Sequence, residues 1–114
     1  MARVLGIHQL DLLPGADEQA FEKFMTERFA PLYHHYDPRQ VAYLMKGDRG
    51  ERAGKYSLVI EVESVEARDD MYPAEGQVSA TLQEALVANA ALFTEFKSYL
   101  ALPDPPHTDY VVMG

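Results

Sequence analysis

Residues 43–63 read YLMKGDRGERAGKYSLVIEVE, and this stretch decides the fold. Two runs of strand character, at 40–45 and 55–63, flank a polar, glycine-containing connection at 47–54. The second run alternates sharply, with an apolar residue at every even position from 56 to 62. The pattern predicts a β-hairpin whose connection is mobile, because it is longer than a tight hairpin turn. Ser64 follows directly and can cap a short helix over 65–71.

The segment before the hairpin predicts one strand and one helix. Residues 3–12 form a strand with apolar side chains at both parities, so both of its faces are expected to be covered. Residues 17–33 have apolar positions at the three-to-four spacing of an amphipathic helix. Pro31 removes one backbone donor, and we therefore expect a kink or an early end of the helix there.

The segment after the hairpin predicts a second, longer helical region and a last strand. Thr81-x-x-Glu84 has the form of a capping box, and the apolar stripe that follows runs to Leu102. Asn89 interrupts this stripe and is expected to cap a second helical segment. A proline-rich linker then leads to a strand over 107–113.

This order of elements predicts a single α+β domain over residues 1–114. The expected arrangement is ferredoxin-like, βαββαβ, with an antiparallel sheet, helices on one face and an extra helical segment before the last strand. A right-handed first crossover predicts the first and third strands as central neighbours, which we expect to run parallel. The other face would carry Val59 with Tyr110 or Val111. That apolar surface is too large to leave in water, which predicts a homodimer formed through the sheet face.

The element order, together with the stretch GDRGERAGKYSLVIEVESVEARD at 47–69, resembles the dimeric α/β-barrel superfamily. This superfamily includes antibiotic-biosynthesis-type monooxygenases, muconolactone isomerase, EthD-like and NIPSNAP-like proteins, stress-responsive barrel proteins and haem-handling relatives. Residues 72–102 form a longer insertion than its smallest members have. The resemblance implies a cofactor-independent, monooxygenase- or isomerase-like enzyme acting on a small aromatic or keto compound. The alternative it implies is a non-catalytic ligand-binding or stress-responsive dimer.

Composition excludes several classes of function. The chain has no cysteine, so disulfides, thiolate metal sites and thiol nucleophiles are excluded, in keeping with a cytoplasmic protein. It has no tryptophan, which the haem-degrading relatives use, and no cofactor is expected. Ten basic against 18 acidic residues give a net charge of −8, which argues against a nucleic-acid partner. No window approaches a membrane span. The acidic residues gathered at 61–75 indicate a solvated face or, less simply, a site for a cation or basic partner.

Three residues form the candidate catalytic set. His8 lies at the parity opposite Leu5 and Ile7; if those two face the helices, His8 and Glu61 share the other face of adjacent strands. A histidine paired with a carboxylate is a workable general base, because the carboxylate fixes the tautomer and orientation of the ring. The same pair would also serve as a structural hydrogen bond. Tyr43 could present its hydroxyl to a ligand from the neighbouring strand.

Four further residues are candidates for ligand binding. His34 and His35 follow the first helix, where a structural role at the negative helix end is the alternative. Adjacent histidines point about 100° apart on a helix, so no metal site is predicted from them. Arg49 and Arg52 could close over an anionic ligand, or simply be solvated. His107, after the prolines, is expected to be exposed.

Overall fold

Four strands form one antiparallel sheet in the computed structural model, which describes residues 2–114. The strands are β1 (Val4–Leu10), β2 (Gln40–Lys46), β3 (Tyr56–Val62) and β4 (His107–Val111), in the spatial order β2-β3-β1-β4. The hairpin expected from residues 43–63 is confirmed as the β2–β3 pair. β1 and β3 are central neighbours as predicted, but they run antiparallel, so the parallel pairing was wrong. The helical crossover instead makes β1 and β2 run the same way, with β3 between them.

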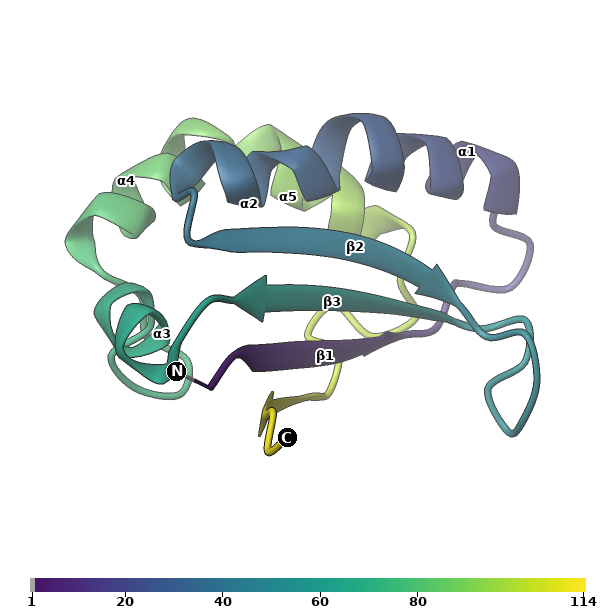
Figure 1. Ribbon diagram of the computed structural model, residues 1–114. Helices are drawn as coiled ribbons and strands as arrows, with labels where there is room; N and C mark the ends of the chain where they lie inside the picture. Colours follow the sequence, from purple (N-terminus) through teal and green to yellow (C-terminus); the bar gives the residue numbers. More distant parts are fainter. Residues whose placement is uncertain (1) are drawn as a thin grey trace.

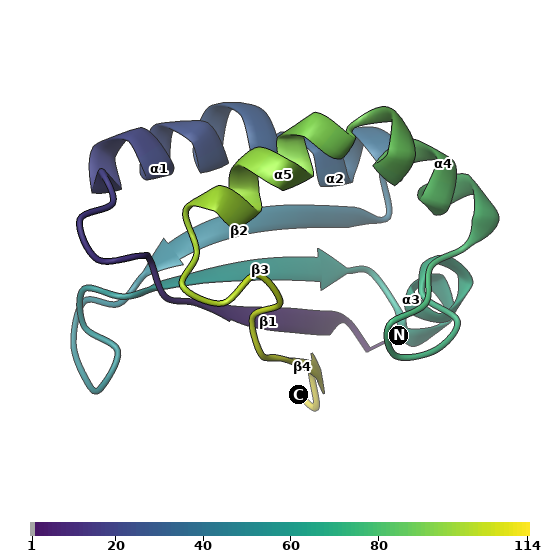
Figure 2. The same ribbon diagram turned by 180° about the vertical axis from the view of Figure 1, so that it is seen from behind.

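Helices cover one face of this sheet (Figures 1 and 2). The first helical run consists of α1 (Glu18–Phe24), a π-helical segment (Met25–Phe29) and α2 (Ala30–Tyr36). It lies beside α5 (Ala90–Ser98), which follows α4 (Ala80–Ala88). The short helix α3 (Val65–Met71) lies at one end of the sheet. Within residues 2–114 the opposite face of the sheet carries no helix, and none of the helices is long and apolar enough to cross a bilayer.

The core lies between the sheet and the first helical run. Phe21, Phe29 and Met25 are fully buried there, and the Phe29 ring stacks on Phe96 of α5 at a centroid distance of 4.4 Å. The sheet contributes alternate residues of β3, which confirms the apolar face expected from its even positions. Burial of each such side chain is worth roughly 1.5–3 kcal/mol, so this interface holds the helices on the sheet.

The early end expected at Pro31 is not observed, and the run instead changes to a π-helical turn just before it. The π-helical turn lies directly before the proline, where the Ala30 amide donates to the Met25 carbonyl. Pro31 then occupies the first turn of α2, where a missing N–H costs little, and the helix continues to Tyr36. The wider turn accommodates the proline without breaking the run.

The second helical region begins earlier than the capping box predicted. Ser79, not Thr81, caps α4 by accepting from the Leu82 amide at 3.2 Å. Asn89 does separate two helices, but its side chain donates back to the Ala85 carbonyl instead of capping α5. The helix stops at Ser98, short of the expected end. Ser64 caps α3 as predicted, accepting from the Ala67 amide at 3.1 Å.

The face of β1 that meets the helices is the reverse of the one expected. Val4 lies opposite Val62 and His8 opposite Leu58, so the even-numbered side chains of β1 point toward the helices. Val4 and Leu10 are almost fully buried on that side. Leu5 and Ile7 lie on the uncovered face. Because both parities of β1 are apolar, the sequence pattern did not determine which one is inside.

Candidate functional site

A cavity of about 900 Å³ lies on the helix side of β1 and β4. Its floor is the inward face of β1, with Val4, Gly6 and His8, next to Ile60 and Val62 of β3. The walls come from the end of α3 and the connection at 72–78, from α4, and from residues 104 and 107–109. The cavity therefore combines an apolar floor with polar walls, which is typical of sites for small molecules.

His8 and His107 form a stacked pair at the floor of this cavity. The register of β1 and β4 places them directly opposite each other, and their ring centroids are 4.7 Å apart with planes 12° from parallel. The Nδ1 atom of His8 is buried and has no hydrogen-bond partner within residues 2–114. Burial lowers the pKa of His8, and nearby His107 lowers that pKa further, whereas the backbone at Leu58, the charge of Asp109 and the backbone at Gly6 act in the opposite direction. These effects favour the neutral imidazole, the form that can accept a proton.

Asp109 lies beside the two histidine rings because Gly6, the residue opposite it in β1, has no side chain to occupy that space. A side chain at Gly6 would place its Cβ 2.9 Å from Asp109 Oδ1, so only glycine leaves the carboxylate its present position. The other oxygen, Oδ2, accepts from Arg68 Nη1 at 2.7 Å, while Arg68 Nε donates to Asp69 at 2.8 Å. The two carboxylates raise the pKa of the Arg68 guanidinium, the Asp69 hydrogen bond contributing most.

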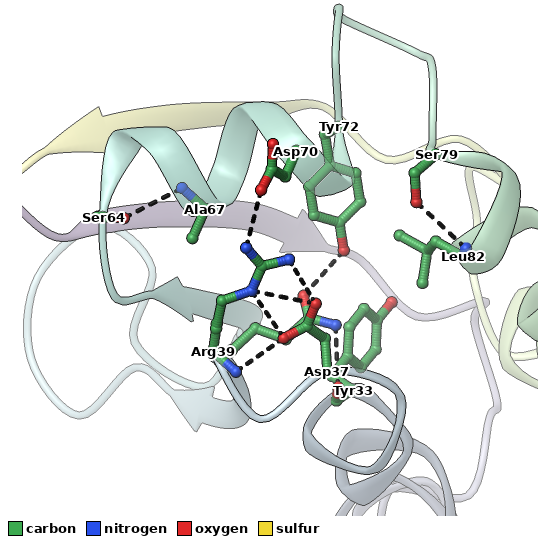
Figure 3. Close-up of polar contacts among 10 residues, drawn as sticks. Tyr33, Asp37, Arg39, Ser64, Ala67, Asp70, Tyr72, Ser79 and Leu82 are labelled. Carbon is green, nitrogen blue, oxygen red and sulfur yellow. Dashed lines mark hydrogen bonds and ion pairs between the residues drawn. The ribbon is translucent and has the colours of Figure 1, made fainter.

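Tyr72, at the C-terminal end of α3, joins the cavity wall to the core (Figure 3). Its hydroxyl donates to the Gln40 side-chain oxygen at 3.0 Å, and the Gln40 amide donates to the Tyr33 carbonyl at 2.9 Å. Gln40 is only 1% exposed, so both of its polar ends are satisfied inside the protein. Burial raises the pKa of Tyr72 to about 12, which keeps the hydroxyl protonated.

Arg39 fastens α3 to the start of β2 next to this contact. Its guanidinium donates to Asp37 at 2.8 Å and to Asp70 of α3 at 3.0 Å, as the central dashed lines of Figure 3 show. The Arg39 hydrogen bond holds the pKa of Asp37 below its usual range. Part of the acidic stretch at 61–75 is thus paired with arginine: Asp70 with Arg39, and Asp69 with Arg68.

The predicted His8–Glu61 pair is wrong. Glu61 lies opposite Leu5 on the uncovered face of the sheet, whereas His8 faces the helices. Glu61 instead forms an ion pair with Arg3 at 3.0 Å. Tyr43 also lies on the uncovered face, opposite Val59 and 46% exposed, and does not line the cavity. Only His8 of the candidate catalytic set reaches the cavity.

The four candidate ligand-binding residues lie away from the cavity as well. His34 Nδ1 is 2.9 Å from the Gln40 carbonyl, and since a carbonyl accepts, this nitrogen donates. The His35 ring is 6.2 Å from the Tyr36 ring. The Arg49 side chain is 96% exposed, while Arg52 donates to the Tyr56 carbonyl at 2.9 Å and fastens its loop to β3.

The sequence reasoning missed His107, Asp109, Arg68 and Tyr72. His107 is exposed as expected, and exposure by itself gives no reason to count it among the candidate site residues. Its ring nevertheless stacks on the ring of His8. A usable signal was present: His107 and Asp109 share one parity of the last strand, which the predicted order places beside the first. Within residues 2–114, no three His, Asp or Glu side chains are grouped so as to hold a metal ion.

Comparisons with known proteins found no match for this chain. No family model matches the chain, and no curated protein or solved structure is significantly similar to it. The class that fold and site define is therefore an α+β protein with a four-stranded antiparallel sheet and a histidine-lined cavity.

Proposed function

We propose that this protein binds a small, partly apolar carbonyl or aromatic compound in the cavity and transfers a proton with His8 as the general base. The observation that carries the proposal is the position of His8, whose ring lies at the cavity floor, stacked on His107 and beside the Asp109 carboxylate. Surroundings that favour the neutral ring leave it unprotonated and able to accept a proton at neutral pH, and groups with shifted pKa values are concentrated in active sites.

The reaction is isomerase-like. His8 removes a proton from the carbon next to a carbonyl, and the electron pair of the broken C–H bond moves to the carbonyl oxygen as an enolate. Arg68 lines the same cavity, and its Nη2 makes no hydrogen bond within residues 2–114, so it is the donor available to the enolate oxygen. Asp109 stabilises the imidazolium, which then returns the proton to carbon. Cofactor-independent oxygenation, the other chemistry that the resemblance implies, would begin with the same proton removal.

We further infer a ferredoxin-like chain that forms a homodimer through its uncovered sheet face, as in the dimeric α/β-barrel superfamily. The strand order β2-β3-β1-β4 supports the first part. For the second, Tyr43, Met45 and Tyr110 lie on that face and are 46%, 48% and 54% exposed. They surround Val59 and the half-buried Leu5, and this surface extends across all four strands. A second copy offers the same apolar surface and would cover it.

Proton abstraction can be tested before the natural substrate is identified. Benzylacetone in D₂O is incubated with the protein, and loss of its α-proton signals is followed by NMR. We expect exchange above the buffer rate for the native chain and for His35→Phe, and the buffer rate for His8→Phe. Exchange that survives in His8→Phe, with the variant folded by circular dichroism, would exclude His8 as the base.

A second function is favoured by one feature of the same site. No carboxylate is hydrogen-bonded to either ring nitrogen of His8 within the described residues, so the ring lacks the partner that usually orients a base. Shifts of the His8 NMR signals on adding the ketone, without α-proton exchange, would indicate a non-catalytic binding protein.

The dimer is tested by light scattering. We expect twice the 12.8 kDa chain mass at micromolar concentration. Tyr110→Glu places a charge on the apolar face and should give the monomer mass. Val87→Glu, on α4 and 66% exposed, is the matched control and should remain dimeric. A native mass near that of one chain would refute the dimer.

A further inference from the structure

We infer that the cavity accepts uncharged or cationic small molecules and rejects carboxylates and phosphates. This inference rests on the proposed function only in taking the cavity as the ligand site. It names the charge class of the ligand, which proton transfer by His8 does not determine.

The balance of charge along the cavity wall is the first argument. Among the described residues that line it, Arg68 is the only lysine or arginine. Four carboxylates share the wall: Asp69, Glu75, Asp104 and Asp109. An anion entering the cavity therefore meets more negative than positive charge, in a chain whose net charge is −8.

The one cation of the wall is already neutralised. Arg68 donates to Asp69 at 2.8 Å and to Asp109 at 2.7 Å, and it is mostly buried, with 23% of its side chain exposed. Two charge-assisted hydrogen bonds occupy two of its donors and offset its charge. A carboxylate ligand could reach only the remaining N–H groups of this guanidinium, with two carboxylates already beside it.

Asp109 keeps one oxygen free for a donor. Its Oδ2 atom accepts from Arg68, while Oδ1 lies over Gly6, where no Cβ intervenes, and has no partner within residues 2–114. The stacked rings of His8 and His107 adjoin it. An ammonium or hydroxyl group can donate to this oxygen while the apolar part of the ligand lies on Val4 and the neighbouring β3 residues.

His8 does not reverse this balance. His8 is surrounded by groups whose combined effect favours its neutral form, since its burial and the adjacent His107 both disfavour the imidazolium. A neutral imidazole neither attracts an anion by charge nor repels an amine. The carboxylates therefore dominate the field inside the cavity.

Three probes of one shape separate the charge classes: benzylacetone is neutral, phenylpropylamine is cationic and phenylpropionate is anionic at neutral pH. Dissociation constants are obtained by NMR titration from the imidazole signals of His8 and His107. We expect the ketone and the amine to bind at least about tenfold more tightly than the carboxylate, the size of effect that one like charge produces a few ångströms away.

The outcomes are distinct. Equal or tighter binding of the carboxylate would overturn the inference while leaving the cavity as a ligand site. If no probe moves either imidazole signal, the cavity is not such a site, and the proposed function fails together with the inference.

Two variants distinguish the effect of the carboxylates in the cavity wall on ligand binding from the effect of the net charge of the chain. Asp109→Asn should tighten phenylpropionate binding at least about threefold, because it releases Arg68 and removes one nearby negative charge. Asp48→Asn makes the same change in net charge at a side chain that is 97% exposed in the loop at 47–54, and should leave all three constants unchanged. An equal effect of both variants would show that net charge, and not the cavity wall, selects the ligand.

Discussion

Replacing Gln40 by leucine tests the buried contact that holds Tyr72 at the cavity wall. Gln40 is 1% exposed and makes two side-chain hydrogen bonds, to the Tyr33 carbonyl at 2.9 Å and from the Tyr72 hydroxyl at 3.0 Å. Leucine keeps most of the volume but removes both of these hydrogen bonds. Each buried polar group left unpaired costs about 1–3 kcal/mol.

The two costs are not equal. The Tyr72 hydroxyl loses its one hydrogen-bond partner within residues 2–114, whereas the Tyr33 carbonyl still accepts from the Asp37 amide at 3.2 Å. We therefore expect Gln40→Leu to lower the free energy of unfolding by about 1–3 kcal/mol, most of it from the Tyr72 hydroxyl. For a chain of this length that corresponds to a fall in Tm of roughly 4–12 °C.

The assay is urea unfolding followed by circular dichroism at one fixed protein concentration, because dimerisation would otherwise change the apparent stability. Tyr72→Phe alone should cost about 1 kcal/mol, and the double variant should cost about 1 kcal/mol less than the sum, since the two residues share a bond. Gln83→Leu, exposed on α4, is the control and should change stability by less than about 0.5 kcal/mol. A Gln40→Leu protein as stable as the native chain, or strict additivity, would refute the reasoning.

Three other changes test separate parts of the structure. Gly6→Ala should cost about 1 kcal/mol or less, since the Asp109 carboxylate can shift, yet it should weaken benzylacetone binding measured by NMR because the new methyl group enters the cavity. The pKa of His8 is lower in the folded chain than its ordinary 6.5, so the unfolded chain binds more protons between the two values and stability should fall as pH drops below 6.5. In urea titrations at several pH values His8→Phe should flatten this slope, and an unchanged slope would assign it to other groups. Ser64→Ala removes the cap of α3 and should cost about 1 kcal/mol in the same assay, whereas an unchanged midpoint would show that the hydrogen bond to Ala67 contributes nothing.

Local pattern was enough to predict the elements. Alternation over 56–62, the helical spacing after Asp17 and the serine before α3 all reflect interactions between residues near one another in the chain, so they can be recognised without the fold. The errors in placing helix ends also arose locally, at positions where two signals in the same stretch of sequence competed. Ser79 and Thr81 are both able to cap α4, and the π-helical turn that accommodates Pro31 leaves no mark in the apolar spacing.

The sequence by itself determined the order of the elements, the β2–β3 hairpin and the need to cover an apolar sheet. It also pointed to His8. The tertiary structure alone decided which face of β1 is inside, because apolar residues occupy both parities and only the register with β3 distinguishes them. That register separates His8 from Glu61 and, through β4, brings it against His107 and Asp109, about a hundred residues along the chain. Contacts at such separation depend on strand pairing, which no local pattern encodes.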